Sequence, residues 1–148
     1  MLRATAVKPA GSWEAAAARD CVVLDFDARH RRRIRLTTDT GRAVLLDLKE
    51  ARAMADGDGL RLAEGGWLRV KAAKEPLLEI RCRDPHLLLR VAWHLGNRHL
   101  AAEVHRDRIL IRPDHVIDAM LRGLGASVRH GAAAFQPEGG AYADGHHL

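Results

Sequence analysis

The apolar residues of this chain change their spacing once, near Lys74-Glu75-Pro76, and this change restricts the fold more than any other feature. Upstream of it, short apolar runs alternate with glycine-containing turns, which is typical of strands. Downstream of it, two segments carry apolar residues at helical spacing. Proline also disfavours helix at the residue before it, so this position is a natural break. The sequence therefore predicts two domains of different class within 148 residues.

The upstream half predicts a small all-β domain. Three turns supply the positive φ angles that tight connections need, namely Asp39-Thr40-Gly41, Asp56-Gly57-Asp58-Gly59 and Gly65-Gly66. The strands expected between turns cover residues 22–26, 34–37, 43–48, 60–62 and 67–70. Residues 49–55 fit either one helical turn or a loop.

The downstream half predicts a ferredoxin-like order of elements. Asp84 is expected to cap a first helix with Pro85 at its first position, and Gly96 is expected to stop that helix. The expected elements are strand 77–82, helix 84–95, strands 101–104 and 108–111, helix 114–124 and a strand within 127–135. This βαββαβ order is the ferredoxin-like arrangement.

The predicted fold class is therefore α+β. A small all-β N-terminal domain covers residues 1–75, a ferredoxin-like C-terminal domain covers residues 76–136, and a flexible tail covers residues 137–148, which hold too little apolar material to pack. Each domain would bury only about 60% of the surface of its unfolded chain, so self-association is expected.

The net charge of +5 comes from 24 basic and 19 acidic residues, and much of the excess lies in the arginine-rich run 29–35. One interpretation of this run is a phosphate-binding surface of a nucleic-acid-binding module. The other is a solvated strand edge or turn that charge protects from pairing. No aromatic residues are interleaved with the arginines, so the second interpretation is favoured and nucleic acid is not expected as a partner.

The two cysteines, Cys21 and Cys82, lie far apart and form no CxxC or Cys/His pattern. Each is interpreted as a small buried apolar side chain. The chain shows no secretory signal and no apolar run of the roughly 20 residues that would cross a membrane. We expect a cytoplasmic protein with reduced thiols and no membrane contact.

Two histidines are candidate metal ligands in the second half. His99 falls just past the end of the first expected helix, on a connection where a side chain is free to bind, although an ordinary polar loop residue fits the same position. His115 falls in the first turn of the second helix, about 200° around the axis from the buried Ile117 and therefore outward. Asp114 is either its hydrogen-bond partner or the helix cap, and residue preference favours the cap.

A single exposed imidazole is a poor site for a divalent ion, but a two-fold dimer would supply His99 twice. Nitrogen-rich sites with open positions suit Ni(II), Cu(II) and Zn(II). The remaining histidines of the helices and strands have no partner at ligand spacing or are interpreted as structural: His30, His86, His94, His105 and His130.

The segment His94-Leu95-Gly96-Asn97-Arg98-His99 is one of six informative segments, and the others are 41–48, 56–60, 70–79, 112–121 and 135–142. Together they resemble the UreE family of urease accessory nickel chaperones. The resemblance covers nearly the whole chain.

The resemblance implies a homodimer in which His99 of both subunits holds one Ni(II), with Zn(II) or Cu(II) also binding in vitro. His115 and the tail histidines His146 and His147 are expected to add ligands, although Pro113 replaces a histidine that several relatives carry two positions before His115. The urease accessory GTPase and the urease apoprotein complex are the implied partners. The N-terminal domain resembles peptide-binding modules of the Hsp40 type, which suggests that partners dock there.

The implied function is a nickel metallochaperone that delivers Ni(II) for urease assembly and is not an enzyme. The alternatives are a metal-dependent hydrolase and a basic nucleic-acid-binding module. A hydrolase would need a general base, yet the chain shows no HExxH motif, carboxylate pair or Ser/His/Asp order.

Overall fold

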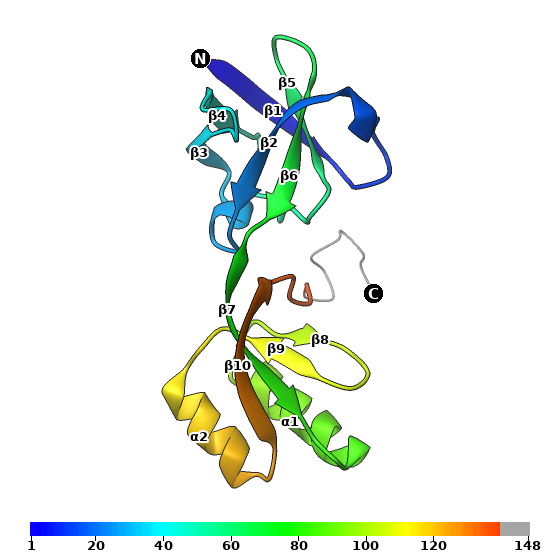
Figure 1. Cartoon of the computed structure of the whole chain (residues 1–148), viewed down its shortest axis with the longest axis vertical. Helices are drawn as coiled ribbons and strands as arrows, with labels where there is room; N and C mark the ends of the chain where they lie inside the picture. The colour runs from blue at the N-terminus through cyan, green and yellow to red at the C-terminus, as the bar shows by residue number, and fades with distance from the viewer. Residues whose placement is uncertain (140–148) are drawn as a thin grey trace. The chain divides into compact units, whose positions relative to one another are not determined.

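The computed structural model describes residues 1–139 and confirms the α+β class (Figure 1). The chain divides into two compact units, one of residues 1–73 and one that begins at Lys74. The first unit contains strands and two short 3-10 turns, whereas the second combines strands with two α-helices. Among the described residues, no helix is long and apolar enough to span a membrane.

The first unit is a six-stranded curled sheet with the strand order β2-β6-β5-β1-β4-β3 (Figure 1). Its strands are β1 (Leu2–Lys8), β2 (Ala18–Leu24), β3 (Arg33–Thr37), β4 (Ala43–Asp47), β5 (Gly59–Leu62) and β6 (Trp67–Ala72). The strands bury their apolar residues in one core, which includes the fully buried Val22, Leu46, Leu60 and Val70. The expected turns join β3 to β4, β4 to β5 and β5 to β6.

The sequence pattern did not reveal β1, which lies inside the sheet between β5 and β4. Its pairing with β5 shifts register between Ala4 and Ala6, so the buried Ala4 and Val7 stand three residues apart instead of two. This bulge breaks the alternation by which strands are recognised in a sequence.

One further expectation in this unit was wrong. The strand expected at residues 22–26 is β2, and it ends at Leu24 because Asp25 Oδ1 accepts a hydrogen bond from Ala28 N at 2.9 Å and starts the 3-10 turn Ala28–His30. Of the two alternatives left open for residues 49–55, the structure shows the loop. These residues are irregular, and Met54 among them is buried, with its N–H donating to the Arg29 carbonyl oxygen at 2.9 Å.

The second unit is a four-stranded antiparallel sheet with the order β10-β7-β9-β8. Its elements are β7 (Lys74–Arg81), α1 (Pro85–Asn97), β8 (Glu103–Val104), β9 (Ile109–Ile111), α2 (His115–Gly123) and β10 (Ser127–Ala134). This order confirms the predicted βαββαβ arrangement. The strand β7 starts three residues earlier than expected and includes Pro76, which is tolerated because only β10 pairs with β7 there.

One core holds this unit together. The helix α1 buries Leu88, Val91 and Leu95, and α2 buries Ile117 and Leu121. They pack in one cluster with the same face of the sheet, through Leu78, Ile80, Ile109, Ile111 and Val128. Because both helices cover that face, their ends and the loops that follow lie at the rim of the unit.

Candidate metal-binding site

The helix α1 starts as the sequence predicts but does not stop at Gly96. Asp84 Oδ1 accepts a hydrogen bond from His86 N at 2.9 Å, with Pro85 at the first helical position. At the other end the helix continues through Gly96 to Asn97. The residue that turns the chain is His99, whose φ of 57° is the only positive value outside glycine among the described residues.

His99 holds this position through a Schellman motif, the hydrogen-bond pattern that commonly closes a helix. Its N–H donates to the Gly96 carbonyl oxygen at 3.0 Å, and Leu100 N donates to the Leu95 carbonyl oxygen at 3.1 Å. Leu100 packs against the core of this unit, and this contact stabilises the turn at His99. Glycine usually occupies the left-handed position, since a side chain costs about 1 to 2 kcal/mol there. The fold alone therefore gives no reason for a histidine.

His115 lies at the first turn of α2 and is exposed, as predicted. Asp114 acts as the helix cap, because its Oδ1 accepts hydrogen bonds from Val116 N at 2.9 Å and Ile117 N at 3.1 Å. Of the two roles that the sequence left open for Asp114, the structure shows the cap.

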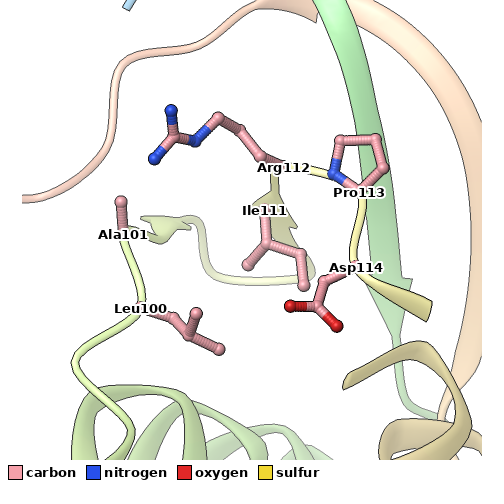
Figure 2. Close-up of a pocket in the computed structure, with 6 residues that line it drawn as sticks. All are labelled: Leu100, Ala101, Ile111, Arg112, Pro113 and Asp114. Carbon is pink, nitrogen blue, oxygen red and sulfur yellow. The ribbon is translucent and has the colours of Figure 1, made fainter. Parts of the chain in front are cut away.

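A pocket of about 360 Å³ is lined by residues that are next in sequence to both candidate ligands (Figure 2). One wall is formed by Leu100 and Ala101, directly after His99. Another is formed by Pro113 and Asp114, directly before His115. Ile111 and Arg112 complete the lining. The fold therefore brings the two histidine-bearing segments to one cavity, although the described part of the chain holds no cluster of three His, Cys, Asp or Glu side chains that could bind a metal ion.

The tail histidines His146 and His147 lie outside the described residues, but the start of the tail is visible. Gln136 N donates to Glu103 Oε1 at 2.7 Å, and Glu138 N donates to the Ala102 carbonyl oxygen at 2.8 Å. The chain after β10 thus runs along residues 102–103. These residues directly follow Leu100 and Ala101, which line the pocket.

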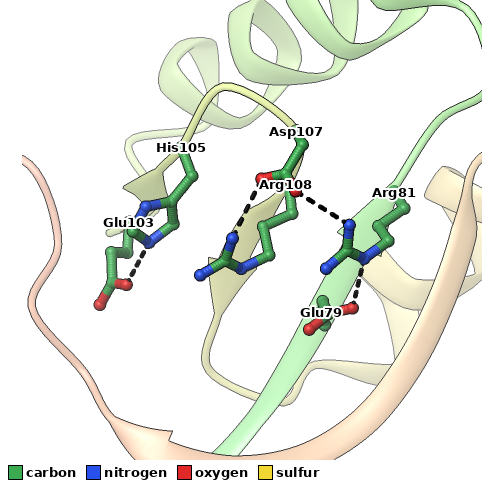
Figure 3. Close-up of polar contacts among 6 residues, drawn as sticks. All are labelled: Glu79, Arg81, Glu103, His105, Asp107 and Arg108. Carbon is green, nitrogen blue, oxygen red and sulfur yellow. Dashed lines mark hydrogen bonds and ion pairs between the residues drawn. The ribbon is translucent and has the colours of Figure 1, made fainter.

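The sequence did not reveal what anchors this tail. Glu103 also contacts His105 Nε2 at 2.5 Å, and a second network joins Arg81 to Glu79 and Asp107 (Figure 3). Glu103 and His105 stand two residues apart along the β8 hairpin, a spacing that could have suggested the pair. His105 therefore has a carboxylate partner within its own hairpin, whereas Gln136 meets Glu103 only because the chain after β10 crosses to β8, at the opposite edge of the sheet.

Cys82 has an environment that disfavours metal binding through sulfur. Burial raises the pKa of its thiol above the ordinary value, and the negative charge of Asp84 adds to this effect. A thiolate is the form that binds metals, so imidazole remains the better donor of this unit.

These features define an α+β protein with exposed imidazoles at its helix ends. Two family descriptions match it: the N-terminal domain of UreE urease accessory protein at residues 2–73 and its C-terminal domain at residues 75–148. The chain belongs to the UreE family, whose members are accessory chaperones without catalytic activity. The expectation that this protein is not an enzyme is confirmed by that membership.

Relatives from several bacteria support the assignment. Urease accessory protein UreE of Bradyrhizobium sp. strain ORS 278 is 54% identical over 147 residues, which are 99% of this chain and 70% of that protein. UreE of Rhodopseudomonas palustris strain HaA2 is 53% identical over 146 residues, 99% of this chain and 67% of that protein. UreE of Chelativorans sp. strain BNC1 is 55% identical over 131 residues, 86% of this chain and 83% of that protein.

Proposed function

We propose that this protein carries Ni(II) as cargo for urease maturation and binds it through histidines at a homodimer interface. The family delivers nickel to urease, and that coarser function follows from membership. The observation that carries the finer proposal is the backbone of His99, which occupies a left-handed position that glycine would fill at lower cost. A residue kept in such a conformation is a candidate for function because the fold does not require it.

The proposed dimer uses the helix that ends at His99. On the outer side of α1, Leu89 and Trp93 are 69% and 65% exposed and lie one helical turn apart. Asn97 follows Trp93 by a further turn, so this apolar pair leads toward the end of the helix that carries His99. Burial of the pair against a second copy would bring two His99 imidazoles near the symmetry axis. The interface would then lie within residues 76–136, the proposed metal-binding and dimerisation domain.

The tail is proposed to lend His146 and His147 to this site. Its root is fixed where Glu138 N meets the Ala102 carbonyl oxygen, three residues after His99. Eight further residues lead from Glu138 to His146, and an extended chain of that length spans up to about 26 to 29 Å. A tail of that length is long enough to bring His146 and His147 to His99 of the same chain. His115, which directly follows the pocket-lining Asp114 in sequence, is the proposed ligand of lower rank.

Delivery requires that the ion also leaves the site. An ion held by imidazoles at an exposed surface can exchange them for the ligands of a partner protein more readily than an ion held in a closed thiolate cage. We propose the urease apoprotein and its accessory GTPase as recipients, and residues 1–75 as the partner-docking domain. The cytoplasmic location stays a prediction.

Nickel titration calorimetry combined with light scattering tests the proposal. We expect one tight Ni(II) per dimer for the full chain, and loss of that site in His99→Gly, a substitution that preserves the left-handed turn. His130→Ala serves as the matched control, because it removes a histidine that is 73% exposed on β10 and lies outside the proposed ligand set, and it should bind like the parent. Tight binding of one Ni(II) to each of two independent monomers would contradict the shared site.

A further inference from the structure

The strand β3 ends the N-terminal sheet and pairs only with β4. Two hydrogen bonds fix which of its backbone groups are used: Leu48 N donates to the Arg32 carbonyl oxygen at 3.0 Å, and Thr38 N donates to the Arg42 carbonyl oxygen at 2.9 Å. Hydrogen-bonded residues alternate with non-bonded residues along an antiparallel pair. The even-numbered residues of β3 therefore bond to β4, and the odd-numbered residues direct their N–H and C=O groups away from the sheet.

Arg33, Arg35 and Thr37 are the odd-numbered residues of β3, and all three are exposed. The strand at the other edge of the sheet, β2, comes close to the chain just after β3. There Asp39 N donates to the Cys21 carbonyl oxygen at 2.9 Å. No strand pairing between β2 and β3 exists among the described residues. The open edge therefore runs from Thr37 back to Arg33, with backbone donors and acceptors available at each of these residues.

This edge carries positive charge at a fixed spacing. Arg33 and Arg35 lie two residues apart, which places their side chains on one face about 6.8 Å from each other along the strand. Arg33 Nη1 lies 3.7 Å from Asp47 Oδ1, but its side chain stays 58% exposed. An added strand presents its own alternate side chains at the same spacing, so carboxylates at every second position would face the two guanidinium groups.

We propose that β3 binds an acidic, extended segment of a partner protein, which adds to the sheet as a strand and places alternate carboxylates opposite Arg33 and Arg35. The backbone bonds provide the general attraction, and the charges select the partner. The same charges disfavour pairing between two copies of this edge, since arginines would then face each other. The interaction is independent of the nickel chemistry of the other domain, and it gives the arginine-rich run a role.

A nucleic acid fits this edge less well than a peptide. The described strand β3 carries no aromatic side chain on which a base could stack. Phosphodiester groups also lack the N–H donors that the outward carbonyl oxygens need. A nucleic acid is therefore the alternative occupant that the experiment must distinguish from a peptide.

Amide hydrogen exchange of the full chain tests the proposal with a capped eight-residue peptide of alternating Glu and Thr. In the free protein the Ile34 and Leu36 amides should exchange slowly and those of Arg33 and Arg35 quickly. Saturating peptide should slow the Arg33 and Arg35 amides. No binding, or protection confined to other strands, would overturn the proposal. Equal protection by a single-stranded oligonucleotide would replace it with a nucleic-acid interface.

Matched charge reversals separate an edge site from general attraction. Arg35→Glu should weaken binding of the acidic peptide by at least about tenfold and favour the analogue with Lys in place of Glu, because each cross-strand charge pair changes sign. Arg69→Glu is the control, since Arg69 is also exposed but its strand β6 has β2 and β5 on both sides. Similar weakening by the two variants would show that only net charge matters and would overturn the proposal.

Discussion

The two helices of the ferredoxin-like domain end in the same way but with different residues. At the end of α2, Gly125 has a φ of 98° and donates to the Arg122 carbonyl oxygen, while Ala126 N donates to the Leu121 carbonyl oxygen, both at 3.0 Å. At the end of α1 the equivalent left-handed residue is His99. The domain therefore contains its own reference for what this turn requires.

The difference separates a structural requirement from a functional one. Both turns satisfy the same backbone groups, so the hydrogen bonds do not explain the choice of residue. Space does not explain it either, because a Cβ at Gly125 would make only an ordinary contact, 3.7 Å from Leu87 Cδ2. The remaining difference is the side chain of His99. It is exposed, and in the left-handed conformation it lowers the stability of the fold. In the proposed function, nickel binding offsets that cost.

The largest expected difference between the two helix ends is in nickel affinity. His99→Gly converts the end of α1 into a copy of the end of α2, and in a dimer it removes two ligands from one site. We expect the affinity of the tightest Ni(II) to fall by more than about a hundredfold, since even indirect partners of a metal ligand are worth about 10- to 100-fold. Calorimetry at equal protein concentration measures this, and unchanged affinity would assign the primary site to other residues.

A smaller effect is expected on self-association. Trp93→Glu places charge in the exposed pair on α1, and a tryptophan central to an interface contributes at least about 2 kcal/mol. The dimer dissociation constant should rise at least about thirtyfold. Analytical ultracentrifugation measures this dissociation constant. Leu124→Glu is unsuitable as a control, because Leu124 is half-buried at the cap of α2. Val116→Glu is the better control because Val116 is 58% exposed on the other helix. Equal weakening by both variants would show that the interface is not specific to α1.

The start of α2 should contribute less than the end of α1. His115→Ala leaves the Asp114 cap in place, so the helix should keep its fold. Because this residue is one ligand of lower rank, nickel affinity should fall by less than about tenfold, below the effect of removing an indirect partner. Nickel competition with a coloured chelator resolves such a change, and a loss as large as that of His99→Gly would give the two histidines equal rank.

The same comparison explains which parts of the structure were predictable from the sequence. Asp84, Pro85 and Asp114 act on residues within one helical turn, so both helix starts were predicted correctly. The end of α1 was not, because glycine is the usual marker and Gly96 stands three residues before the left-handed residue. The tail root was hidden because Gln136 and Glu103 are 33 residues apart, and no pattern in the sequence shows that the chain after β10 returns to β8 at the opposite edge of the sheet.

The smallest effect, on stability, is the most direct test of the comparison. In the nickel-free protein, His99→Gly should stabilise the C-terminal domain by about 1 kcal/mol through relief of the left-handed backbone, whereas Gly125→Ala should destabilise it by about 1 to 2 kcal/mol. For a domain of this size, 1 kcal/mol corresponds to a shift in melting temperature of about 4 to 8 °C. Urea unfolding of the two variants beside the parent measures both signs. If His99→Gly were instead destabilising, the imidazole would make contacts that hold the fold, and its conformation would no longer point to metal binding.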